Sequence, residues 1–592
     1  MDVVVMAINA SGLPTARKVA DALGAPLHGR EGRVDADVTF PDALAHARDL
    51  FAAGTAIVGV CASGILIRGV APLLSDKRAE PPVLSVSDDG AVVVPLLGGH
   101  RGANRLARRI AEATGGTAAV TTAGDVALGV ALDEPPAGWT LTNPQHAKPA
   151  MAALLSGGGA AVDGVPWLDL PPGDAVRITG TTRPTEGADD HLVFHPRRFV
   201  LGVGASRGCP EAELAGLVDE ALADLDLAPG ALAAIATADL KADEPAIVAL
   251  AKRMDLPLRL FDAAALEAET PRTATPSDVV FAELGTHGVA ENAALALAGP
   301  DATLARPKHK SAMATVAVAE APEPIVHLNG RRRGRVSLVG IGPGQAAWRT
   351  PEASRLIADA DELVGYSLYI DLLGPLAAGK PRADFPLGGE EARCRHALDR
   401  AAEGRDVALI CSGDAGIYAM GALVLELMDR EDAPRAWGGV SVVHAPGISA
   451  LQAAAARSGA PLGHDFCAIS LSDLLTPRDD ILRRLRAAAD GDFVVALYNP
   501  VSKKRRDLMA QARDILLTGR PGDTPVLLAS SLGRPEERLR IRKLAEVEVD
   551  EIDMLTVVLI GSSNTRILDT AEGPRLYTPR GYARKMAGGD LA

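Results

Sequence analysis

The chain has 592 residues, a formal net charge of −14, 47% hydrophobic residues and only 3% aromatic ones. Its length suggests several domains of roughly 150 residues each, and its acidic balance argues against a nucleic-acid scaffold. Abundant glycine and alanine are typical of tightly packed α/β layers, in which turns use glycine and helices use alanine.

The cysteines and the N-terminal stretch indicate the cellular compartment of the protein. The five cysteines are far apart and form no CxxC pair, so we expect neither a zinc site nor a disulfide framework. Buried thiols in a reducing cytoplasm are the expectation. Residues 1–8 form an apolar strand without a basic lead or cleavage site, and no apolar run of about 20 residues follows. These features predict a cytoplasmic protein that binds neither a membrane nor nucleic acid.

The first part of the chain alternates short β-rich runs with alanine-rich helices. Residues 56–61 form a predicted strand before a Ser-Gly turn, and residues 91–97 form another before a glycine-rich loop at 98–104. A helix follows with apolar residues at positions 106, 110 and 111. This alternation predicts an open α/β domain over residues 1–133.

Two further units and a linker follow. Paired prolines and a polar, turn-rich stretch mark a looser middle segment over residues 134–197. A strand that opens at Phe199 begins a third unit, residues 198–320. Prolines and the basic run 331–335 then predict an exposed linker over residues 321–333.

The stretch 336–344, Val-Ser-Leu-Val-Gly-Ile-Gly-Pro-Gly, is a buried strand that runs into a turn of alternating glycines. Bare backbone in such a turn can lie against a ligand, most often a dinucleotide. Here Pro343 stiffens the turn, and Pro351 interrupts the helix that a dinucleotide site requires. Two later strands, 407–411 and 442–445, also end in polar glycine loops, so we expect three strand ends to converge on one cleft.

The segments GIGPG, SGDAGIYAMG, HAPGISALQAAAARSGAPLGHDFCAISLSDLLTP and FVVALYNPVSKKR resemble the tetrapyrrole methyltransferase family. Their order is kept from residue 334 to 580, and GHDFCAISLSDLLTP is similar to the precorrin-3B C(17)-methyltransferases within that family. The resemblance implies a two-lobed, class III S-adenosylmethionine-dependent methyltransferase over residues 334–592. Such an enzyme binds its cofactor between the lobes and methylates a ring carbon of a corrin precursor. It also implies a possible homodimer through this domain.

The resemblance places the cofactor contacts on the strand-end loops. Asp414, between glycines, would serve the ribose or amino group of the cofactor, with a turn aspartate that caps the next helix as the alternative. Methyl transfer from a sulfonium needs positioning more than proton chemistry. The other implied cofactor residues are Pro343, Gly344, Gly413, Ile417, Tyr418, Ser449, Ala450, Tyr498, Asn499, Thr556 and Gly561.

Four other residues of this domain are candidates for contact with the substrate. His464 and Asp465 would face it as catalytic residues, although such a pair also serves as a structural hydrogen bond. Lys503 and Arg505 would bind substrate carboxylates, and the alternative is a solvated helix start.

The first 320 residues resemble a second family. IVGVCASGILIRGVAPLLSDKRAEPPVLSV, LLGGHRGANRLARRIA, FVLGVGASRGCP, ADLKADEPAI and RPKHKSAMATVAVAEA are similar to segments of cobalt-precorrin-5A hydrolase. That family opens the lactone left by ring contraction and releases acetaldehyde, so the resemblance implies a bifunctional enzyme of cobalamin biosynthesis. Two alternatives stay open: the first half is a non-catalytic carrier of corrin intermediates, or the glycine turn belongs to a dinucleotide-dependent oxidoreductase.

A lactone hydrolase must activate water and stabilise an oxyanion beside an anionic macrocycle. His100, on the glycine loop, is the candidate base and Arg101 the candidate partner for a carboxylate or oxyanion. A helix-capping histidine is the alternative. Candidate substrate-binding residues are Arg68, Lys77, Lys241, Glu244, Lys308 and Lys310, against the alternative of solvated lysine clusters. No metal site is predicted, and the sequence leaves open whether the substrate carries cobalt.

Overall fold

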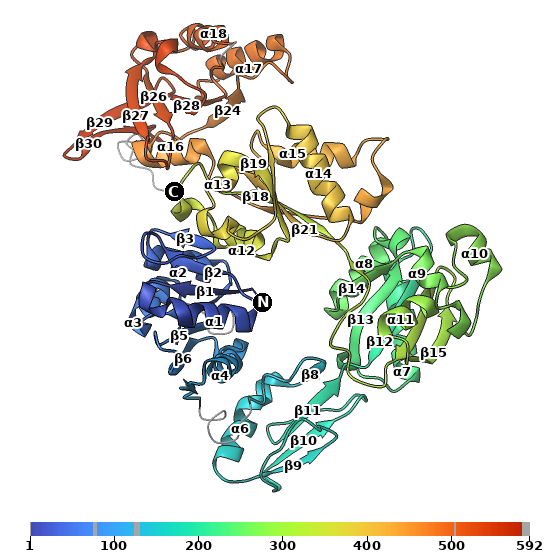
Figure 1. Ribbon diagram of the computed structural model, residues 1–592. Helices are drawn as coiled ribbons and strands as arrows, with labels where there is room; N and C mark the ends of the chain where they lie inside the picture. The colour runs from blue at the N-terminus through green and yellow to red at the C-terminus, as the bar shows by residue number, and fades with distance from the viewer. Residues whose placement is uncertain (1, 75–79, 123–130, 503–504, 583–592) are drawn as a thin grey trace.

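The computed structural model describes residues 2–74, 80–122, 131–502 and 505–582. The chain forms a series of α/β units, each built around its own sheet (Figure 1). The first three units lie within residues 2–332, and a two-lobed part follows. This architecture confirms the predicted multidomain α/β class.

The first unit has a seven-stranded sheet in the order β3-β2-β1-β4-β5-β6-β7. Strands β1 to β5 run parallel, whereas β6 runs antiparallel to β5. The predicted strands at 56–61 and 91–97 and the helix after them are confirmed. The elements are β1 (Val3–Ala7), β2 (Leu27–Arg30), β3 (Val38–Phe40), β4 (Ala56–Val60), β5 (Val83–Val86), β6 (Val92–Leu97), β7 (Thr117–Ala118), α1 (Leu13–Leu23), α2 (Ala43–Ala52), α3 (Ser63–Val70) and α4 (Ala103–Thr114).

The middle unit is more regular than its turn-rich sequence suggested. It has a four-stranded sheet in the order β8-β11-β10-β9 and its own apolar core, which includes Ile178, Leu192 and Phe194. The strands are short and separated by prolines and glycines, so the turn signals masked them. The elements are β8 (Trp139–Leu141), α6 (Ala147–Leu155), β9 (Ala160–Asp163), β10 (Val176–Gly180) and β11 (His191–Pro196).

The third unit has a sheet in the order β15-β16-β12-β13-β14-β17, in which β12, β13 and β14 are parallel. Its last strand, β17, comes from the predicted linker, so the basic end of that linker extends a sheet instead of lying free. The elements are β12 (Phe199–Ala205), β13 (Leu232–Ala238), β14 (Leu258–Phe261), β15 (Thr303–Lys310), β16 (Ala314–Glu320), β17 (Arg331–Arg332), α7 (Glu211–Asp224), α8 (Pro245–Met254), α9 (Ala263–Glu267), α10 (Asp278–Leu284) and α11 (Ala290–Ala298).

The first lobe of the two-lobed part has a parallel sheet in the order β20-β19-β21-β18-β22. The three strands that end in glycine loops, β21, β18 and β22, are neighbours, which confirms their predicted convergence. Pro351 begins helix α12 behind the capping residue Thr350 and does not break a helix, because proline suits the first helical position. The elements are β18 (Arg335–Gly340), α12 (Pro351–Asp359), β19 (Glu362–Tyr366), α13 (Ser367–Asp371), β20 (Arg382–Phe385), α14 (Glu390–Ala402), β21 (Asp406–Cys411), α15 (Met420–Met428) and β22 (Ser441–Ala445).

The second lobe has a mixed sheet in the order β24-β25-β28-β26-β27, with a small sheet β23-β30-β29 beside it. Only β24 and β25 run parallel in the larger sheet. The elements are α16 (Ala450–Ser458), β23 (Gly459–Ala460), β24 (Phe466–Ser470), α17 (Arg478–Asp490), β25 (Val494–Tyr498), α18 (Asp507–Leu516), β26 (Pro525–Ser530), β27 (Arg538–Lys543), β28 (Thr556–Ile560), β29 (Arg566–Thr570) and β30 (Gly573–Tyr577).

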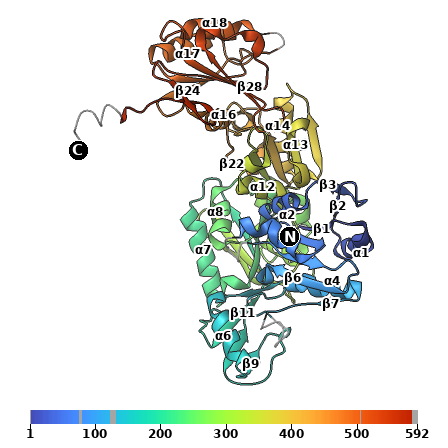
Figure 2. The same ribbon diagram turned by 90° about the vertical axis from the view of Figure 1, so that its left-hand side faces the viewer.

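The first lobe lies between the second lobe and the units that precede it in the chain. The second lobe lies on one side of it, and the first and third units lie on the other (Figures 1 and 2). Helix α2 of the first unit packs against α12, and Ala53 is buried in the apolar core of the first lobe. The third unit contacts the same lobe where Ala242 meets Gly439. Within the described ranges, no helix is long and apolar enough to cross a membrane.

Candidate functional site

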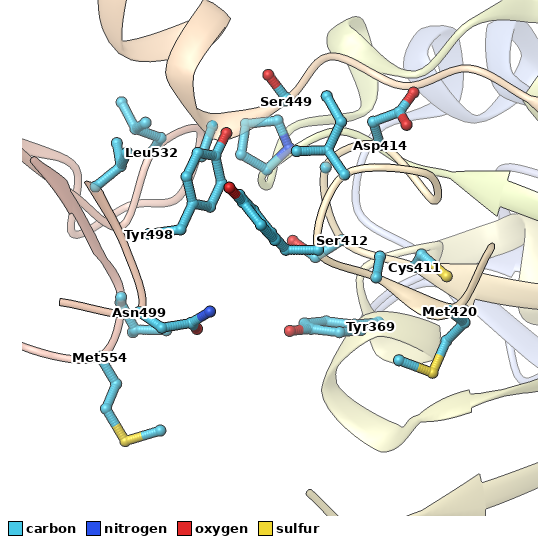
Figure 3. Close-up of a pocket in the computed structure, with 18 of the residues that line it drawn as sticks. Tyr369, Cys411, Ser412, Asp414, Met420, Ser449, Tyr498, Asn499, Leu532 and Met554 are labelled. Carbon is cyan, nitrogen blue, oxygen red and sulfur yellow. The ribbon is translucent and has the colours of Figure 1, made fainter. Parts of the chain in front are cut away.

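A cavity of about 330 Å³ lies between the two lobes (Figure 3). Loops after β18, β21 and β22 form its wall on the first lobe, and the ends of β25, β26 and β28 form the opposite wall. Ten of the twelve predicted cofactor residues line it. They are Pro343, Gly413, Asp414, Ile417, Tyr418, Ser449, Ala450, Tyr498, Asn499 and Thr556.

Glycines let the first-lobe loops pack directly on each other at the floor of this site. The amide of Gly342 donates to the carbonyl of Gly413 at 3.1 Å, and the amide of Gly413 donates back at 2.9 Å. A Cβ on Gly340 would lie 2.7 Å from the Gly413 carbonyl oxygen, a separation that sterics forbid. Gly413 has φ of 69°, in the left-handed region that favours glycine. Of the predicted glycine turn, only Pro343 lines the cavity, and the bare backbone at the cavity wall comes from Gly413 of the next loop.

Asp414 joins two of the loops. Its Oδ1 accepts from the amide of Gly416 at 2.8 Å, and its Oδ2 accepts from the amide of Gly447 at 2.9 Å. The side chain is 13% exposed, with His444 Nε2 3.8 Å away. Both carboxylate oxygens thus accept from loop amides, which favours a structural turn role, but Asp414 does not cap the next helix, since the N-cap residue of α15 is Ala419. The residue also lines the cavity.

Two tyrosines connect the lobes across the cavity. The hydroxyl of Tyr418, from the first lobe, donates to the carbonyl of Ala468 on β24 at 2.8 Å. Its ring lies 5.2 Å from that of Tyr498, whose hydroxyl accepts from the amide of Leu451 at 3.0 Å. Burial raises the pKa of both phenols, so both stay protonated at neutral pH. The cavity thus offers neutral hydroxyl groups and no phenolate.

Strained backbone is concentrated here. Tyr418, Asn499 and Ser531 have φ of 50° to 51°, a left-handed conformation that side chains disfavour. They are three of the six such non-glycine residues in the described part of the chain, and all three line the cavity. Strain of this kind persists only where the surroundings impose it, and it clusters at functional sites.

Several lining residues had no motif to reveal them. Tyr369, in helix α13 after β19, points its hydroxyl toward Asn499 on the facing wall (Figure 3). Arg393 is 3% exposed and donates to the carbonyl of Pro386 at 3.2 Å. The others are Leu387, Glu390, Ile410, Cys411, Ser412, Ala419, Met420, Ser531, Leu532, Arg534, Met554, Leu555 and Val557. A signal existed for Ile410 and Cys411, in the predicted strand 407–411, and for Ser412, Ala419 and Met420, in the segment SGDAGIYAMG.

Two predicted cofactor residues lie outside the cavity lining. Gly344 lies where the lobes touch, since a Cβ there would be 2.6 Å from the carbonyl oxygen of Leu532. Gly561 follows the far end of β28, whose other end, Thr556, lines the cavity. The antiparallel direction of β28 separates the two, and the sequence could not reveal it.

The predicted substrate residues of this domain are not at the cavity either. His464 and Asp465 precede β24, whose opposite end, Ser470, pairs with Tyr498, so a five-residue strand of roughly 16 Å separates them from the site. They contact each other, with 55% and 81% of their side chains exposed. Arg505 is 10% exposed and pairs with Asp473 at 3.0 Å, which makes it a structural ion pair. Lys503 lies outside the described residues.

The hydrolase candidates of the first unit lie on separate elements. His100 and Arg101 lie in a 3-10 helix (Gly99–Arg101) after β6. Because β6 is antiparallel, this loop is at the edge opposite to the carboxyl ends of β1 and β4. Arg68 is exposed on α3 and donates to the carbonyl of Gly64 at 2.9 Å. Lys77 lies outside the described residues.

In the third unit, three of the four predicted substrate-binding residues lie at the same edge of the sheet. Lys241, Glu244 and Lys310 all follow or end strands at the carboxyl edge of β12 and β13, where ligands bind in open α/β sheets. Glu244 is fully buried, and within the described residues neither of its carboxylate oxygens has a hydrogen-bond partner; Arg207 Nη1 is 3.8 Å away. Burial, with Arg207 nearby, lowers the pKa of Lys241. Lys308 instead donates to the carbonyl of Thr275 at 3.1 Å, a structural contact.

The fold and site define the last 260 residues as a two-lobed α/β module with a small-molecule cavity between its lobes. The family model of Tetrapyrrole (Corrin/Porphyrin) Methylases matches residues 335–548. A Sinorhizobium sp protein named precorrin-3B C(17)-methyltransferase is 45% identical over 251 residues, covering 42% of this chain and 98% of that protein. The chain therefore belongs to the tetrapyrrole methylase family.

The preceding units also match known families. The model of the Cobalamin synthesis G N-terminal region matches residues 45–125, and that of the Cobalamin synthesis G C-terminus matches residues 199–319.

Two further comparisons are with methyltransferases. A Priestia megaterium protein named cobalt-factor III methyltransferase is 40% identical over 253 residues, covering 43% of this chain and 46% of that protein. The crystal structure of the methyltransferase CobJ is 39% identical and covers 42% of this chain and 100% of its own, with a TM-score of 0.39.

Proposed function

We propose that this chain is a bifunctional enzyme of cobalamin (vitamin B12) biosynthesis. Its part from 334 to 592 would be a class III methyltransferase that methylates carbon 17 of precorrin-3B, or of cobalt-factor III, with ring contraction. The observation that carries this proposal is the interlobe cavity, where ten residues expected from the family resemblance meet. The 45% identity to a protein named for this reaction supports it.

The cavity fits S-adenosylmethionine as the methyl donor. That molecule combines a sulfonium cation, an amino acid group and a ribose, so its site needs backbone amides, hydroxyls and carbonyls. The residues that line the cavity include Gly413, Ser412, Ser449 and Tyr498, which carry groups of these kinds. Its volume is in the range of small-molecule sites, which begins at about 300 Å³. When bound, S-adenosylmethionine supplies an electrophilic methyl group.

The residues of the chain would act by positioning. Pro343 and Gly413 hold one side of the cavity, while Tyr498 and Asn499 hold the other. The Tyr418 hydroxyl fixes the separation of the lobes through Ala468. A fixed, partly enclosed arrangement favours in-line transfer without a strong acid or base. Tyr418 and Tyr498, both protonated, supply no strong base to the cavity, which is consistent with this mechanism.

The shape of the glycine turn supports S-adenosylmethionine over a dinucleotide as the ligand. In dinucleotide folds the glycine turn leads directly into a helix whose N-terminus holds the pyrophosphate. Here α12 begins at Pro351, seven residues after Gly344. Calorimetric titration with S-adenosylmethionine and with NAD tests this difference: we expect binding of the first only, and binding of NAD alone would overturn the proposal.

We propose further that residues 1–320 open the lactone of cobalt-precorrin-5A and release acetaldehyde. Support comes from the two family models that match there and from Glu244 beside Lys241, a buried carboxylate that has Arg207 at 3.8 Å but, within the described residues, no hydrogen-bond partner. Glu244 could take a proton from water, and Lys241 could bind an anionic substituent. Trapping of acetaldehyde from a cobalt-bound lactone tests this activity. If the intact protein releases none, a non-catalytic carrier role is the better account.

The proposal divides the chain as the sequence suggested, into 1–133, 134–197, 198–320 and 334–592. It includes a homodimer through the methyltransferase part. Light scattering would measure the oligomeric state.

A further inference from the structure

The first unit contacts the methyltransferase part directly behind the cofactor turn. Helix α2 packs against α12, which follows that turn, and against a 3-10 helix at Gly374–Ala377. Ala53, at the end of α2, is 2% exposed and belongs to the same apolar cluster as Ile341 of the turn. The two units therefore share a core here.

Arg349 is the polar centre of this contact. Its side chain is only 4% exposed, and its Nη2 lies 3.9 Å from Oδ1 of Asp49 on α2. Its Nε donates to the hydroxyl of the buried Ser354 on α12 at 3.0 Å. Burial lowers the pKa of Arg349 and raises that of Asp49, because each charge loses water. A cation this deeply buried depends on its partners.

Trp348, the residue before Arg349, connects this contact to the cavity wall. Its indole packs under the guanidinium of Arg457 at 4.6 Å and against Gly533. Its backbone and Cβ lie over Gly342 of the cofactor turn. Gly533 in turn belongs to the loop whose Leu532 and Arg534 line the cavity. Trp348 therefore packs between the cofactor turn of the first lobe and the Gly533 loop of the second lobe, and the contacts of the adjacent Arg349 hold this segment in place.

We propose that Arg349 is a positioning residue for the methyl-donor cavity and that Asp49 of the first unit holds it in place. The first unit is then an integral support of the methyltransferase, in addition to any hydrolase activity of its own. This inference rests on the proposed binding of S-adenosylmethionine.

The test is Asp49→Asn in the full chain. The amide keeps the size of the side chain but leaves the Arg349 cation buried without a charged partner. We expect the affinity for S-adenosylmethionine to fall about threefold to tenfold, in the range for residues that act on a site through others. The KM for S-adenosylmethionine should rise, while kcat at saturating cofactor stays near that of the wild type. The matched control is Asp35→Asn, on the same unit, where a carboxylate that is 93% exposed pairs with Arg17.

A conservative variant keeps the inference testable if Asp49→Asn is poorly folded. Asp49→Glu retains the charge, and we expect it to restore the affinity, measured by calorimetry per folded molecule. Wild-type affinity in Asp49→Asn, or a loss in Asp49→Glu as large as in Asp49→Asn, would overturn the role of the ion pair. If the wild type itself binds no S-adenosylmethionine, the proposed function fails instead, and the two failures are distinguishable.

Discussion

Replacement of Asp414 by Asn separates a structural role of this residue from a ligand role. In the structure both carboxylate oxygens accept backbone amides, from Gly416 and from Gly447. An asparagine offers one oxygen and an amide group that donates, so one of the two loop amides loses its acceptor. The substitution also removes the charge that strengthens the bond that is kept.

The size of this loss follows from the burial of the site. Hydrogen bonds to charged groups contribute about 1.5–3 kcal/mol each, and with 13% of the side chain exposed, solvent replaces little of that. For a domain of this size, such a loss lowers the melting temperature by about 3–12 °C. Scanning calorimetry with and without S-adenosylmethionine measures both the stability and its increase on binding.

The matched control is Asp465→Asn, in the same part of the chain, where the side chain is 81% exposed. We expect its melting temperature to be unchanged. A variant Asp414→Asn that melts with the wild type but no longer binds S-adenosylmethionine would refute the structural reasoning and assign the carboxylate to the ligand.

Three further predictions concern other parts of the chain. Because the buried Glu244 is the proposed base, the variant Glu244→Gln should abolish acetaldehyde release while methyl transfer from labelled S-adenosylmethionine is kept; undiminished release would remove Glu244 from the mechanism. Burial lowers the pKa of His28 to about 4 and that of His46 to about 3, from 6.5, so the folded state favours the neutral rings. Stability should be full above pH 6.5 and fall as the pH decreases from there, and a flat urea-unfolding profile over this range would contradict the burial argument. The fragment 334–592 should bind S-adenosylmethionine because the cavity lies within it, but more weakly than the full chain because it lacks Asp49; equal affinity would count against the support role.

The strand-end loops were predictable because their chemistry is local. A strand, a glycine turn and a polar residue such as Asp414 are contiguous in sequence, and parallel strands bring such loops to one edge. The direction of a strand is not local. His464, Asp465 and Gly561 were placed by motif, yet they lie at the far ends of β24 and β28 from the cavity.

Residues that reach a site from outside any motif could not be predicted. Tyr369 and Arg393 line the cavity from segments that carry no recognisable pattern. The contact of Asp49 with Arg349 joins residues 300 positions apart and depends on how two units dock. Pairing of that kind is set by tertiary packing, which composition and periodicity do not encode.

The most direct test of the central claim is the transfer of label from methyl-labelled S-adenosylmethionine by the full-length protein. The enzyme is supplied separately with precorrin-3B and with cobalt-factor III, and the products are identified by mass. The account predicts one labelled methyl group on a ring-contracted product from at least one of these substrates. Bound S-adenosylmethionine without transfer to either substrate, or no binding at all, would contradict it.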